Sequence, residues 1–546
     1  MPSYEMDRQR WAQLSIYEQM GNIGAEVGRA VNATRNGNQK QAQGAIDRAL
    51  VKPCVFSHHG KPSGEGGDCP GRGDRGRGSA SRPRQGEHTV RKEDAMHRYD
   101  LLVEGAAVVT MDAEDAVVAD GVIGVDGGKI VLLEACRPEV RYQAREVIDA
   151  RGMVALPGFV NTHVHCFQSL LKGLGADKPL IQWLNSSVQP FGVRVTHRQQ
   201  ELATLVASLE ALKSGCTTLC EFFYTSQDPE LADVCIETMQ RTGIRRVFMR
   251  TFQDLGQEYN TPACYIEPVD VAIAEVERLR ASYDDGDMTC VWTGPDVTWA
   301  TSKQGYQKIL EYCLGTDVRY TMHLKETPED DDMCRRHYGM GIVELLESIG
   351  FLTDRFLPVH CVGLTERDIA LFAEHGVSVS HNPAANLYLG SGIAPIPDCV
   401  AAGVNVCLGT DGAASNNATD MLDTMRLAAL VHKGVRRDAT AMSARQVVGM
   451  ATVGGARALG RLHELGTLEV GKKADLVLFD PDHLKSTPLF DPLATVVYSS
   501  SPENIDTTIV NGKVVYQRGR FACGVDEREL AEQVRAEMQG IGLGHR

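Results

Sequence analysis

The chain has 546 residues and a mass of 59.5 kDa, enough for more than one domain or for one large barrel with additions. Its net charge of −15 and its pI of about 5.6 argue against nucleic acid and against an anionic membrane as main partners. No apolar run reaches the roughly 18 residues of a membrane span, and the 15 cysteines form no C-x-x-C pair. We therefore expect a cytoplasmic protein with reduced cysteines.

The first 95 residues differ in character from the rest of the chain. Apolar residues at helical spacing within residues 1–50, with a turn signal between them, predict a helical hairpin. Residues 51–95 are rich in Gly, Arg and Pro and cannot bury a core, so we predict a disordered linker there in preference to an RNA-binding run. Met96 directly precedes the first segment with a folded pattern. We therefore expect residues 1–95 to be dispensable for the activity of the chain.

Patterns typical of β-strands occur at both ends of the remaining chain. Apolar runs in residues 101–131 flank an Asp-Gly-Gly hairpin signal, and those in residues 474–515 flank an Asn-Gly signal. We predict one small β-sandwich formed from both ends, with residues 96–157 as its first part and 456–525 as its second part. A C-terminal helix is predicted over residues 526–546.

The middle of the chain, residues 158–455, alternates short apolar runs with longer helical stretches. Eight strands separated by crossover helices over this length predict a (β/α)₈ TIM barrel of the α/β class. In such a barrel the chemistry lies at the C-terminal ends of the strands. The predicted strands are 158–163, 216–222, 245–250, 290–293, 320–323, 356–360, 377–381 and 404–408.

Three short strings at the ends of predicted strands have the composition of one metal site. They are Asn161–His165, Met322–Glu326 and Leu408–Asn416. Because strand side chains alternate between faces, the two histidines of the first string project the same way. Three imidazoles and one carboxylate suit Zn²⁺ with a position left open for water, which is the composition of a hydrolytic site. The four candidate ligands are His163, His165, His323 and Asp411.

Seven strings, in order along residues 98–520, resemble the amidohydrolase superfamily. The resemblance lies within the amino-heterocycle hydrolases, which include methylthioadenosine/S-adenosylhomocysteine deaminases, guanine and 8-oxoguanine deaminases, and triazine hydrolases such as atrazine chlorohydrolase. Together the strings are highly specific, whereas the H-x-H pair alone would be weak. They are Leu156–His165, Ser214–Thr218, His323–Glu326, Val359–Val362, Ser380–Asn386, Gly409–Asn416 and Gly466–Asp475.

The resemblance implies a role for each site residue. The four candidate ligands match the metal ligands of the family. The fourth strand ends without the bridging lysine of binuclear members, so one divalent metal is expected, Zn²⁺ first and Fe²⁺ as the alternative. Asp411 is also expected to accept a proton from the attacking water. Glu326 matches the glutamate that shuttles protons, and His360 matches the histidine that orients the water and stabilises the tetrahedral intermediate.

Three further residues are expected to contact the substrate, each with a structural alternative. Gln168 follows the first strand and is expected to contact the ring; the alternative is a surface position at a helix N-terminus. Trp183 is expected to form a wall of the pocket, and simple packing is its alternative. Arg250, at the third strand end, is expected to meet an anionic or carbonyl group, and a structural ion pair is its alternative.

Two positions depart from the pattern of the methylthioadenosine/S-adenosylhomocysteine deaminases. Gln182 replaces the glutamate that binds the nucleoside, and Asp296 replaces a histidine at the end of the fourth strand. Both changes fall where ribose and base would be held, and the loss of a buried polar contact can change specificity strongly.

The chemistry that the sequence favours is hydrolytic deamination of an aminated N-heterocycle of the purine, pyrimidine, pterin or triazine type. The attacking group is a hydroxide formed from metal-bound water, and ammonia is released. The alternatives are displacement of a halide, alkoxide or alkylamine from a triazine-like ring, and deamination of methylthioadenosine/S-adenosylhomocysteine. An inactive barrel that serves as a binding protein is a further alternative. A small-molecule substrate and, from the resemblance, a homodimer are the expected partners.

Overall fold

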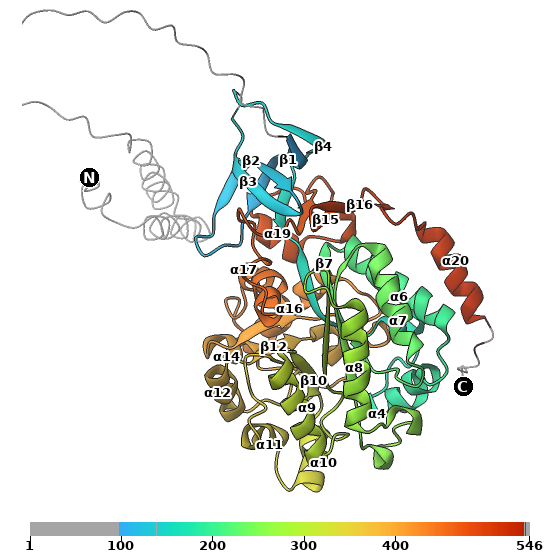
Figure 1. Cartoon of the computed structure of the whole chain (residues 1–546). Coiled ribbons are helices and arrows are strands. Elements are labelled where there is room, and N and C mark those ends of the chain that lie inside the picture. Colours follow the sequence, from blue (N-terminus) through green and yellow to red (C-terminus); the bar gives the residue numbers. More distant parts are fainter. Residues whose placement is uncertain (1–97, 138, 540, 542–546) are drawn as a thin grey trace, which may run out of the picture. The chain divides into compact units, whose positions relative to one another are not determined.

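The computed structural model describes residues 98–137, 139–539 and 541. The helical hairpin, the linker and the folding start at Met96, which we predicted from the sequence, all lie outside these residues. Within them the chain forms two sheets, one of eight strands and one of nine. The first is the parallel sheet of a barrel surrounded by helices, and the second is a separate sheet domain (Figure 1).

All eight predicted barrel strands are present, and each pairs in parallel with the next along the chain. Their side chains are almost all buried on both faces, as expected for a parallel sheet covered by helices. Their bounds agree with the predicted ranges to within two residues at each end. The strands are β6 (Phe159–Val164), β7 (Cys216–Phe223), β8 (Arg245–Phe252), β9 (Thr289–Pro295), β10 (Tyr320–Leu324), β11 (Phe356–His360), β12 (Ser378–His381) and β13 (Asn405–Leu408).

Side chains link the first and last strands where the barrel closes. The Thr162 hydroxyl donates to the backbone oxygen of Leu408 at 2.9 Å. The Asn161 amide donates to the Thr410 hydroxyl at 2.8 Å and accepts from the Thr410 backbone N–H at 3.1 Å. These buried hydrogen bonds hold the C-terminal ends of β6 and β13 together, and both ends carry candidate metal ligands.

Helices connect the strands in the order of a (β/α)₈ barrel, and α6, α7, α8 and α9 run along its outside (Figure 1). Capping boxes at Thr196 and Thr365 satisfy free backbone N–H groups at the starts of α6 and α12. The predicted fold class is confirmed. The helices of the barrel region are α4 (Leu180–Trp183), α5 (Gln189–Gly192), α6 (His197–Lys213), α7 (Glu230–Thr242), α8 (Val269–Tyr283), α9 (Lys303–Thr316), α10 (Pro328–Tyr338), α11 (Ile342–Ser348), α12 (Glu366–His375), α13 (Pro383–Tyr388), α14 (Ile396–Ala401), α15 (Ala413–Asn416), α16 (Met421–Arg436), α17 (Ala444–Gly449) and α18 (Gly455–Ala458).

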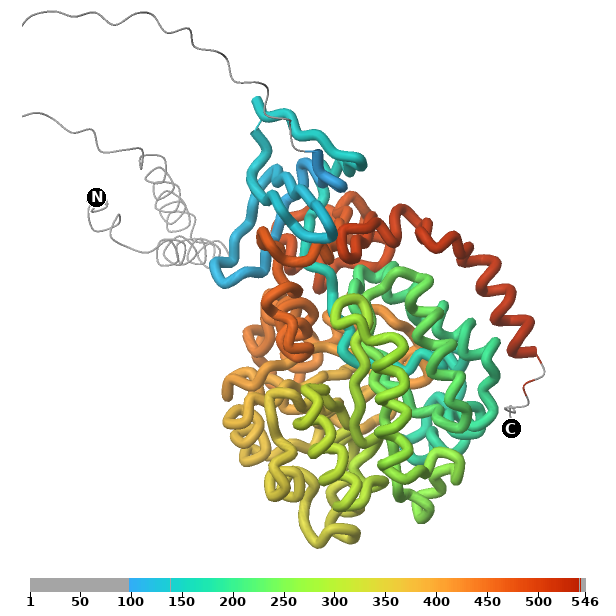
Figure 2. Tube along the Cα trace, in the orientation of Figure 1, coloured from blue at the N-terminus to red at the C-terminus, as the bar shows by residue number. Residues whose placement is uncertain are grey.

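The second sheet combines both ends of the described chain, as expected. In Figure 2 the blue and red segments, far apart in sequence, lie side by side in this domain. The first hairpin turn is bonded to the C-terminal part, because the Ala474 N–H donates to the backbone oxygen of Gly128 at 2.9 Å. The sheet has its own apolar core, to which both ends contribute. Its strands are β1 (Arg98–Val109), β2 (Val117–Asp126), β3 (Lys129–Ala135), β4 (Gln143–Asp149), β5 (Val154–Pro157), β14 (Leu476–Phe479), β15 (Ile505–Val510), β16 (Lys513–Gln517) and β17 (Arg520–Phe521).

Two helices complete the C-terminal region, α19 (Pro492–Tyr498) and α20 (Glu527–Met538). The last helix lies along α6, to which a 2.7 Å ion pair between Glu527 and Lys213 joins it (Figure 1). No helix among the described residues is both long and apolar enough to span a bilayer.

Candidate metal centre and substrate pocket

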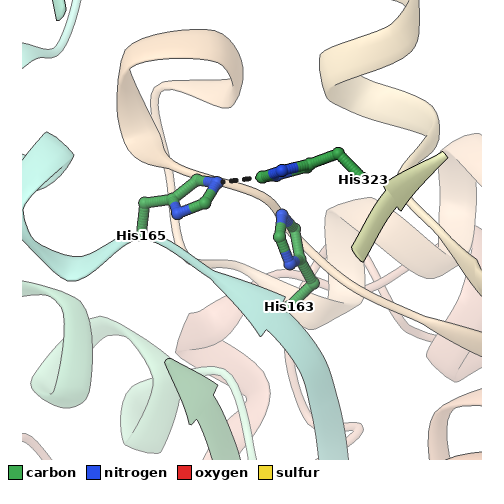
Figure 3. Close-up of side chains that lie close together, drawn as sticks. All are labelled: His163, His165 and His323. Carbon is green, nitrogen blue, oxygen red and sulfur yellow. Dashed lines mark hydrogen bonds between the residues drawn. The ribbon is translucent and has the colours of Figure 1, made fainter. Parts of the chain in front are cut away.

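Three histidines from two strand ends meet at the C-terminal end of the barrel. His163 lies on β6, His165 directly follows it, and His323 lies on β10. Figure 3 shows the three rings turned toward one another, with a ligand nitrogen of each within 4.8 Å of the others. The Nε2 atoms of His165 and His323 are 3.3 Å apart. All three side chains are nearly or fully buried.

Backbone carbonyls fix which ring nitrogens carry the protons. His165 Nδ1 lies 2.7 Å from the backbone oxygen of Phe222, and His323 Nδ1 lies 2.9 Å from that of Asp296. A carbonyl oxygen only accepts, so both Nδ1 atoms are donors, and Nε2 of each ring carries a lone pair whenever that ring is neutral. Burial lowers the pKa of His165, but the nearby Asp411 carboxylate outweighs burial and raises it, so the protein alone favours a proton on this Nε2 atom. When both rings are neutral, as metal binding requires, their lone pairs at 3.3 Å repel each other. A bound cation removes this repulsion, and carbonyl partners of this kind are typical of metal-binding histidines.

His163 completes the group of imidazoles. It is fully buried, and neither of its ring nitrogens makes a hydrogen bond of normal geometry. Burial lowers the pKa of His163 to about 3, so the ring is neutral at pH 7 and available as a ligand. A buried ring with two unpaired nitrogens is costly in the protein alone, which is a second indication of a cation site.

Asp411 supplies the carboxylate beside these rings. Its Oδ1 atom lies 3.2 Å from His163 Nε2 and 3.3 Å from His165 Nε2. The Gly412 N–H donates to Oδ1 at 2.8 Å, and the Ser415 hydroxyl donates to Oδ2 at 3.0 Å, so the carboxylate is held in place. Burial raises the pKa of Asp411, but the contacts with the two histidines outweigh burial and hold it well below its usual value.

The four predicted ligands therefore fit a divalent cation, with neutral nitrogens and an ionised carboxylate gathered from three strand ends. His360 also lies close, because its ligand atom and those of His163 and Asp411 are within 4.8 Å of one another. The fourth strand end, at Asp296, carries no lysine.

Glu326 lies just beyond β10 and is 6% exposed. Its backbone N–H donates to Asp330 Oδ2 at 2.9 Å, which fixes the loop, and its Oε2 atom lies 3.6 Å from His360 Nε2. Burial, reinforced by the charges of Asp411 and Asp330, raises the pKa of Glu326 well above its usual value. A carboxyl of this kind can hold and release a proton near neutral pH.

His360, at the end of β11, presents one defined nitrogen to the site. The Asn386 amide Nδ2 donates to His360 Nδ1 at 3.0 Å, so the proton of the neutral ring is on Nε2, on the side of Glu326. Burial lowers the pKa of His360 well below its usual value and keeps the ring neutral. An Nε2–H donor in this position can stabilise negative charge that develops on an oxygen. The sequence reasoning missed the contribution of Asn386, although this residue ends one of the strings of the resemblance.

Strained backbone occurs at these strand ends, as it does at other positions of the described chain. Lys325, His360 and Asp411 all have left-handed φ angles, of 49°, 71° and 62°. Such conformations cost roughly 1–3 kcal/mol each for residues other than glycine, and they cluster at functional sites. Here Lys325 directly precedes Glu326, and His360 and Asp411 are themselves candidate catalytic residues.

A cavity that is partly open to solvent adjoins these residues, and its space, counted with the open mouth, is about 760 Å³. His165, His323, Glu326, His360 and Asp411 contribute to its wall. Its lining combines apolar side chains with polar groups, as small-molecule sites do.

Two of the three predicted substrate contacts line the cavity, and the third does not. Gln168 and Trp183 both line the cavity, and the Trp183 indole N–H donates to the backbone oxygen of Ala414 at 3.2 Å. Arg250 is not among the lining residues. It is buried in a 2.7 Å ion pair with Glu267, which is the arrangement of the structural alternative.

Several lining residues were not predicted from the sequence. Tyr224, Gln253 and Trp299 reach the cavity from loops and strand ends that carry no recognisable string. The backbone oxygen of Phe222 fixes His165, and such a contact cannot be predicted from residue types, because every residue has a backbone oxygen.

Comparison with known proteins gives a consistent result. The model of the amidohydrolase family matches residues 154–515. A 5-methylthioadenosine/S-adenosylhomocysteine deaminase from Caldicellulosiruptor saccharolyticus is 31% identical over 439 residues, which cover 80% of this chain and 97% of that protein. A 5'-deoxyadenosine deaminase from Methanosarcina barkeri is 35% identical over 436 residues, which cover 79% and 96%.

Solved structures show the same likeness. An adenosine deaminase from Xanthomonas campestris with bound zinc has a TM-score of 0.75 and 30% identity, and the match covers 80% of this chain and 98% of that one. An atrazine chlorohydrolase from Arthrobacter aurescens TC1 complexed with zinc has a TM-score of 0.73 and 28% identity, and the match covers 80% and 99%. The family match, the relatives and the barrel together show that this chain belongs to the amidohydrolase family.

Proposed function

We propose that this protein is a hydrolase that deaminates an aminated N-heterocycle and releases ammonia, with one divalent metal, Zn²⁺ first and Fe²⁺ as the alternative. The observation that carries the proposal is the place of Glu326. It is a buried carboxyl of raised pKa, and its Oε2 atom lies 3.6 Å from Nε2 of His360. It lines one cavity together with His165, His323, His360 and Asp411. The names of the relatives and the zinc in two similar structures support the proposal.

The metal would be held by His163, His165, His323 and Asp411. When bound, a divalent cation lowers the pKa of water to about 7 and so supplies a nucleophile at neutral pH. The remaining chemistry belongs to the side chains of the site.

In this mechanism the oxygen of water bonds to the ring carbon that carries the amine. Asp411 accepts a proton from the attacking water, and Glu326 protonates the adjacent ring nitrogen. The Nε2–H of His360 donates to the attacking oxygen and stabilises its charge. The C–N bond then breaks as the leaving nitrogen takes up the proton that Asp411 holds, and the remaining hydroxyl proton passes to Glu326, which is protonated again. Ammonia departs and the ring keeps a carbonyl, so one proton of water leaves with ammonia and the other replaces the proton that Glu326 gave to the ring.

A second candidate is displacement of halide, alkoxide or alkylamine from a triazine-like ring. The likeness to atrazine chlorohydrolase favours it, since the same nucleophile would serve. Glu326 favours the amine, because an amine must be protonated before it leaves and a halide does not. Deamination of the nucleosides named for the relatives stays a third candidate within the same chemistry.

A screen of aminated and chlorinated heterocycles tests the proposal. Purified protein with Zn²⁺ is incubated with purine, pyrimidine, pterin and triazine amines, and with chloro analogues of the same rings. We expect ammonia release from at least one amine, and the same release should fall sharply in a Glu326→Gln variant. Chloride release without ammonia release from any amine would favour the second candidate. No turnover of any ring by a metal-loaded protein would count against both.

A further inference from the structure

We infer that the cavity selects rings that carry, besides the leaving amine, a neutral or cationic substituent with a hydrogen-bond donor, which Asp296 recognises, and that it rejects anionic substituents. This inference rests on the proposed function and names a substrate class for it. Asp296 is the position at the end of β9 where the sequence departs from the nucleoside deaminases that it resembles.

The Asp296 carboxylate is built into the wall and reaches the cavity. Its side chain is 7% exposed, and the residue lines the cavity. The Gln253 amide Nε2 donates to Oδ2 at 2.8 Å, which fixes the orientation of the carboxylate. Oδ1 lies 3.3 Å from His323 Nδ1, but the proton of that nitrogen is directed to the backbone oxygen of Asp296 at 2.9 Å.

The carboxylate therefore has acceptor capacity to spare. An ionised carboxylate can accept about four hydrogen bonds, and Gln253 supplies the one normal hydrogen bond that the described residues give to this side chain. A substituent with N–H or O–H groups, placed in the cavity beside Asp296, would satisfy these positions.

The side chains of the cavity offer no basic partner to an anionic substituent. Among the described residues that line it there is neither lysine nor arginine, and Asp296 and Asp411 are acidic, whereas Glu326, also acidic, keeps its proton more readily than usual. Arg250, on the neighbouring strand β8, is held by Glu267 at 2.7 Å. A carboxylate or phosphate on the substrate would therefore lack a basic side chain and would meet the charge of Asp296. The lack of lysine and arginine among the described lining residues distinguishes this cavity from one that binds a substrate with an acidic tail.

The first test uses the unmodified protein with rings that differ at one substituent. 2,4-Diaminopyrimidine, 4-amino-2-methylpyrimidine and 4-aminopyrimidine-2-carboxylate present a donor, an apolar group of similar size and an anion. We expect kcat/KM for the diamino ring to exceed that of the methyl ring by about 10- to 100-fold, as for a hydrogen bond to a charged group. The carboxylate should be the poorest of the three. Dissociation constants, from ligand-induced shifts of Tm in the Zn²⁺-loaded protein, should follow the same order.

These two readouts separate the inference from the proposed function. If no ring releases ammonia but the order of binding is as expected, deamination fails as the function and the selectivity stands. If the carboxylate ring binds as tightly as the diamino ring, or the methyl ring is used as well as the diamino ring, the inference is wrong whatever the turnover.

The second test is Asp296→Asn. The variant keeps the size of the side chain, and Gln253 Nε2 would continue to donate to the remaining oxygen, which turns an NH₂ group toward the cavity. The preference for the diamino ring over the methyl ring should fall at least about 10-fold, and a 2-methoxy ring, which only accepts, should gain relative to both. Asp270→Asn is the control, because this carboxylate lies on the surface of α8 with 70% of its side chain exposed.

Zinc content must be measured in the same variants, since Asp296 Oδ1 lies 3.3 Å from His323. We expect it to be unchanged, because the hydrogen bond that fixes His323 goes to the backbone oxygen and not to the side chain. If Asp296→Asn keeps its zinc and also keeps the preference of the parent, Asp296 is not the recognition group. If the variant loses zinc, the role of Asp296 is judged from the first test, in which the unmodified protein is compared on the three rings.

Discussion

The replacement of Glu326 by glutamine tests the core of the proposed mechanism. The change keeps the size and polarity of the side chain but removes its ability to carry a proton. The backbone bond of Glu326 to Asp330, at 2.9 Å, does not involve the side chain and should persist. His360 would still find a polar partner at the position that is now 3.6 Å from its Nε2 atom. The variant therefore removes proton transfer with little other disturbance.

The expected loss follows from the role of the carboxyl. General acid–base catalysis typically contributes about 10²–10⁴-fold, which corresponds to roughly 2.7–5.4 kcal/mol of activation free energy at 1.36 kcal/mol per factor of ten. Stability should not suffer. Burial raises the pKa of Glu326, so the unfolded state releases this proton at a lower pH than the folded state, and the stability of the parent falls as the pH rises between the two pKa values. Glutamine does not ionise, so the variant has no such loss.

The assay compares two leaving groups on one ring. For an amine that the protein hydrolyses, kcat of Glu326→Gln should fall at least about 100-fold, and for the chloro analogue the fall should be smaller because chloride leaves without a proton. Glu329→Gln is the matched control, since Glu329 is an exposed carboxylate three residues further along the chain in α10. Zinc content should be unchanged in both variants. A Glu326→Gln protein that loses its metal, or that hydrolyses both leaving groups as fast as the parent, would refute the assigned role.

Three further predictions concern the groups around Glu326. The parent should bind about one divalent metal per protomer, and a His163→Ala/His165→Ala double variant should bind none and melt at lower temperature; two metals per protomer by elemental analysis would contradict this. Asn386→Ala leaves His360 Nδ1 without its donor, so kcat should fall about 10- to 100-fold with zinc unchanged; unchanged kcat would show that the tautomer needs no such support. Burial raises the pKa of Asp330 to about 7, so the folded state holds a proton that the unfolded state releases near pH 4, and parent stability should fall between about pH 4 and 7 by at most about 4 kcal/mol. Asp330→Asn should remove the part of this fall that comes from Asp330, while the raised pKa of Glu326 leaves a further part, and the variant should be the more stable protein in urea at pH 8; a pH profile equal to that of the parent would contradict the prediction.

The features that could be predicted from the sequence are those that depend on residues close together along the chain. The eight barrel strands are short buried apolar runs, and their order along the chain sets their order in the sheet. The candidate ligands stand directly at the ends of these runs. Because the C-terminal ends of parallel strands share one end of a barrel, the approach of His163 to His323 follows from the position of each histidine alone.

The features that could not be predicted depend on distances between separate loops. Arg250 stands at a strand end like the ligands, yet Glu267, which follows it by 17 residues, binds its guanidinium. Asn386 reaches His360 from α13, the helix after the next strand, and a backbone oxygen of Phe222 fixes His165. No pattern of residue types records such pairings, since many polar side chains in these loops could have made them.

The cost of the site to the folded chain points to what the site is for. His163 is buried without a hydrogen bond of normal geometry to either ring nitrogen, and the Nε2 atoms of His165 and His323 face each other at 3.3 Å. Left-handed backbone at His360 and Asp411 adds strain at the same place. Each of these features is unfavourable for folding by roughly 1–3 kcal/mol in the protein alone. A cation among the imidazoles and a polar ring in the cavity would offset them together, so metal binding should raise Tm, and a ring with a donor substituent should raise it further. If the metal-free protein were as stable as the loaded one, these groups would have found their partners within the chain, and a site for a cation would no longer explain their arrangement.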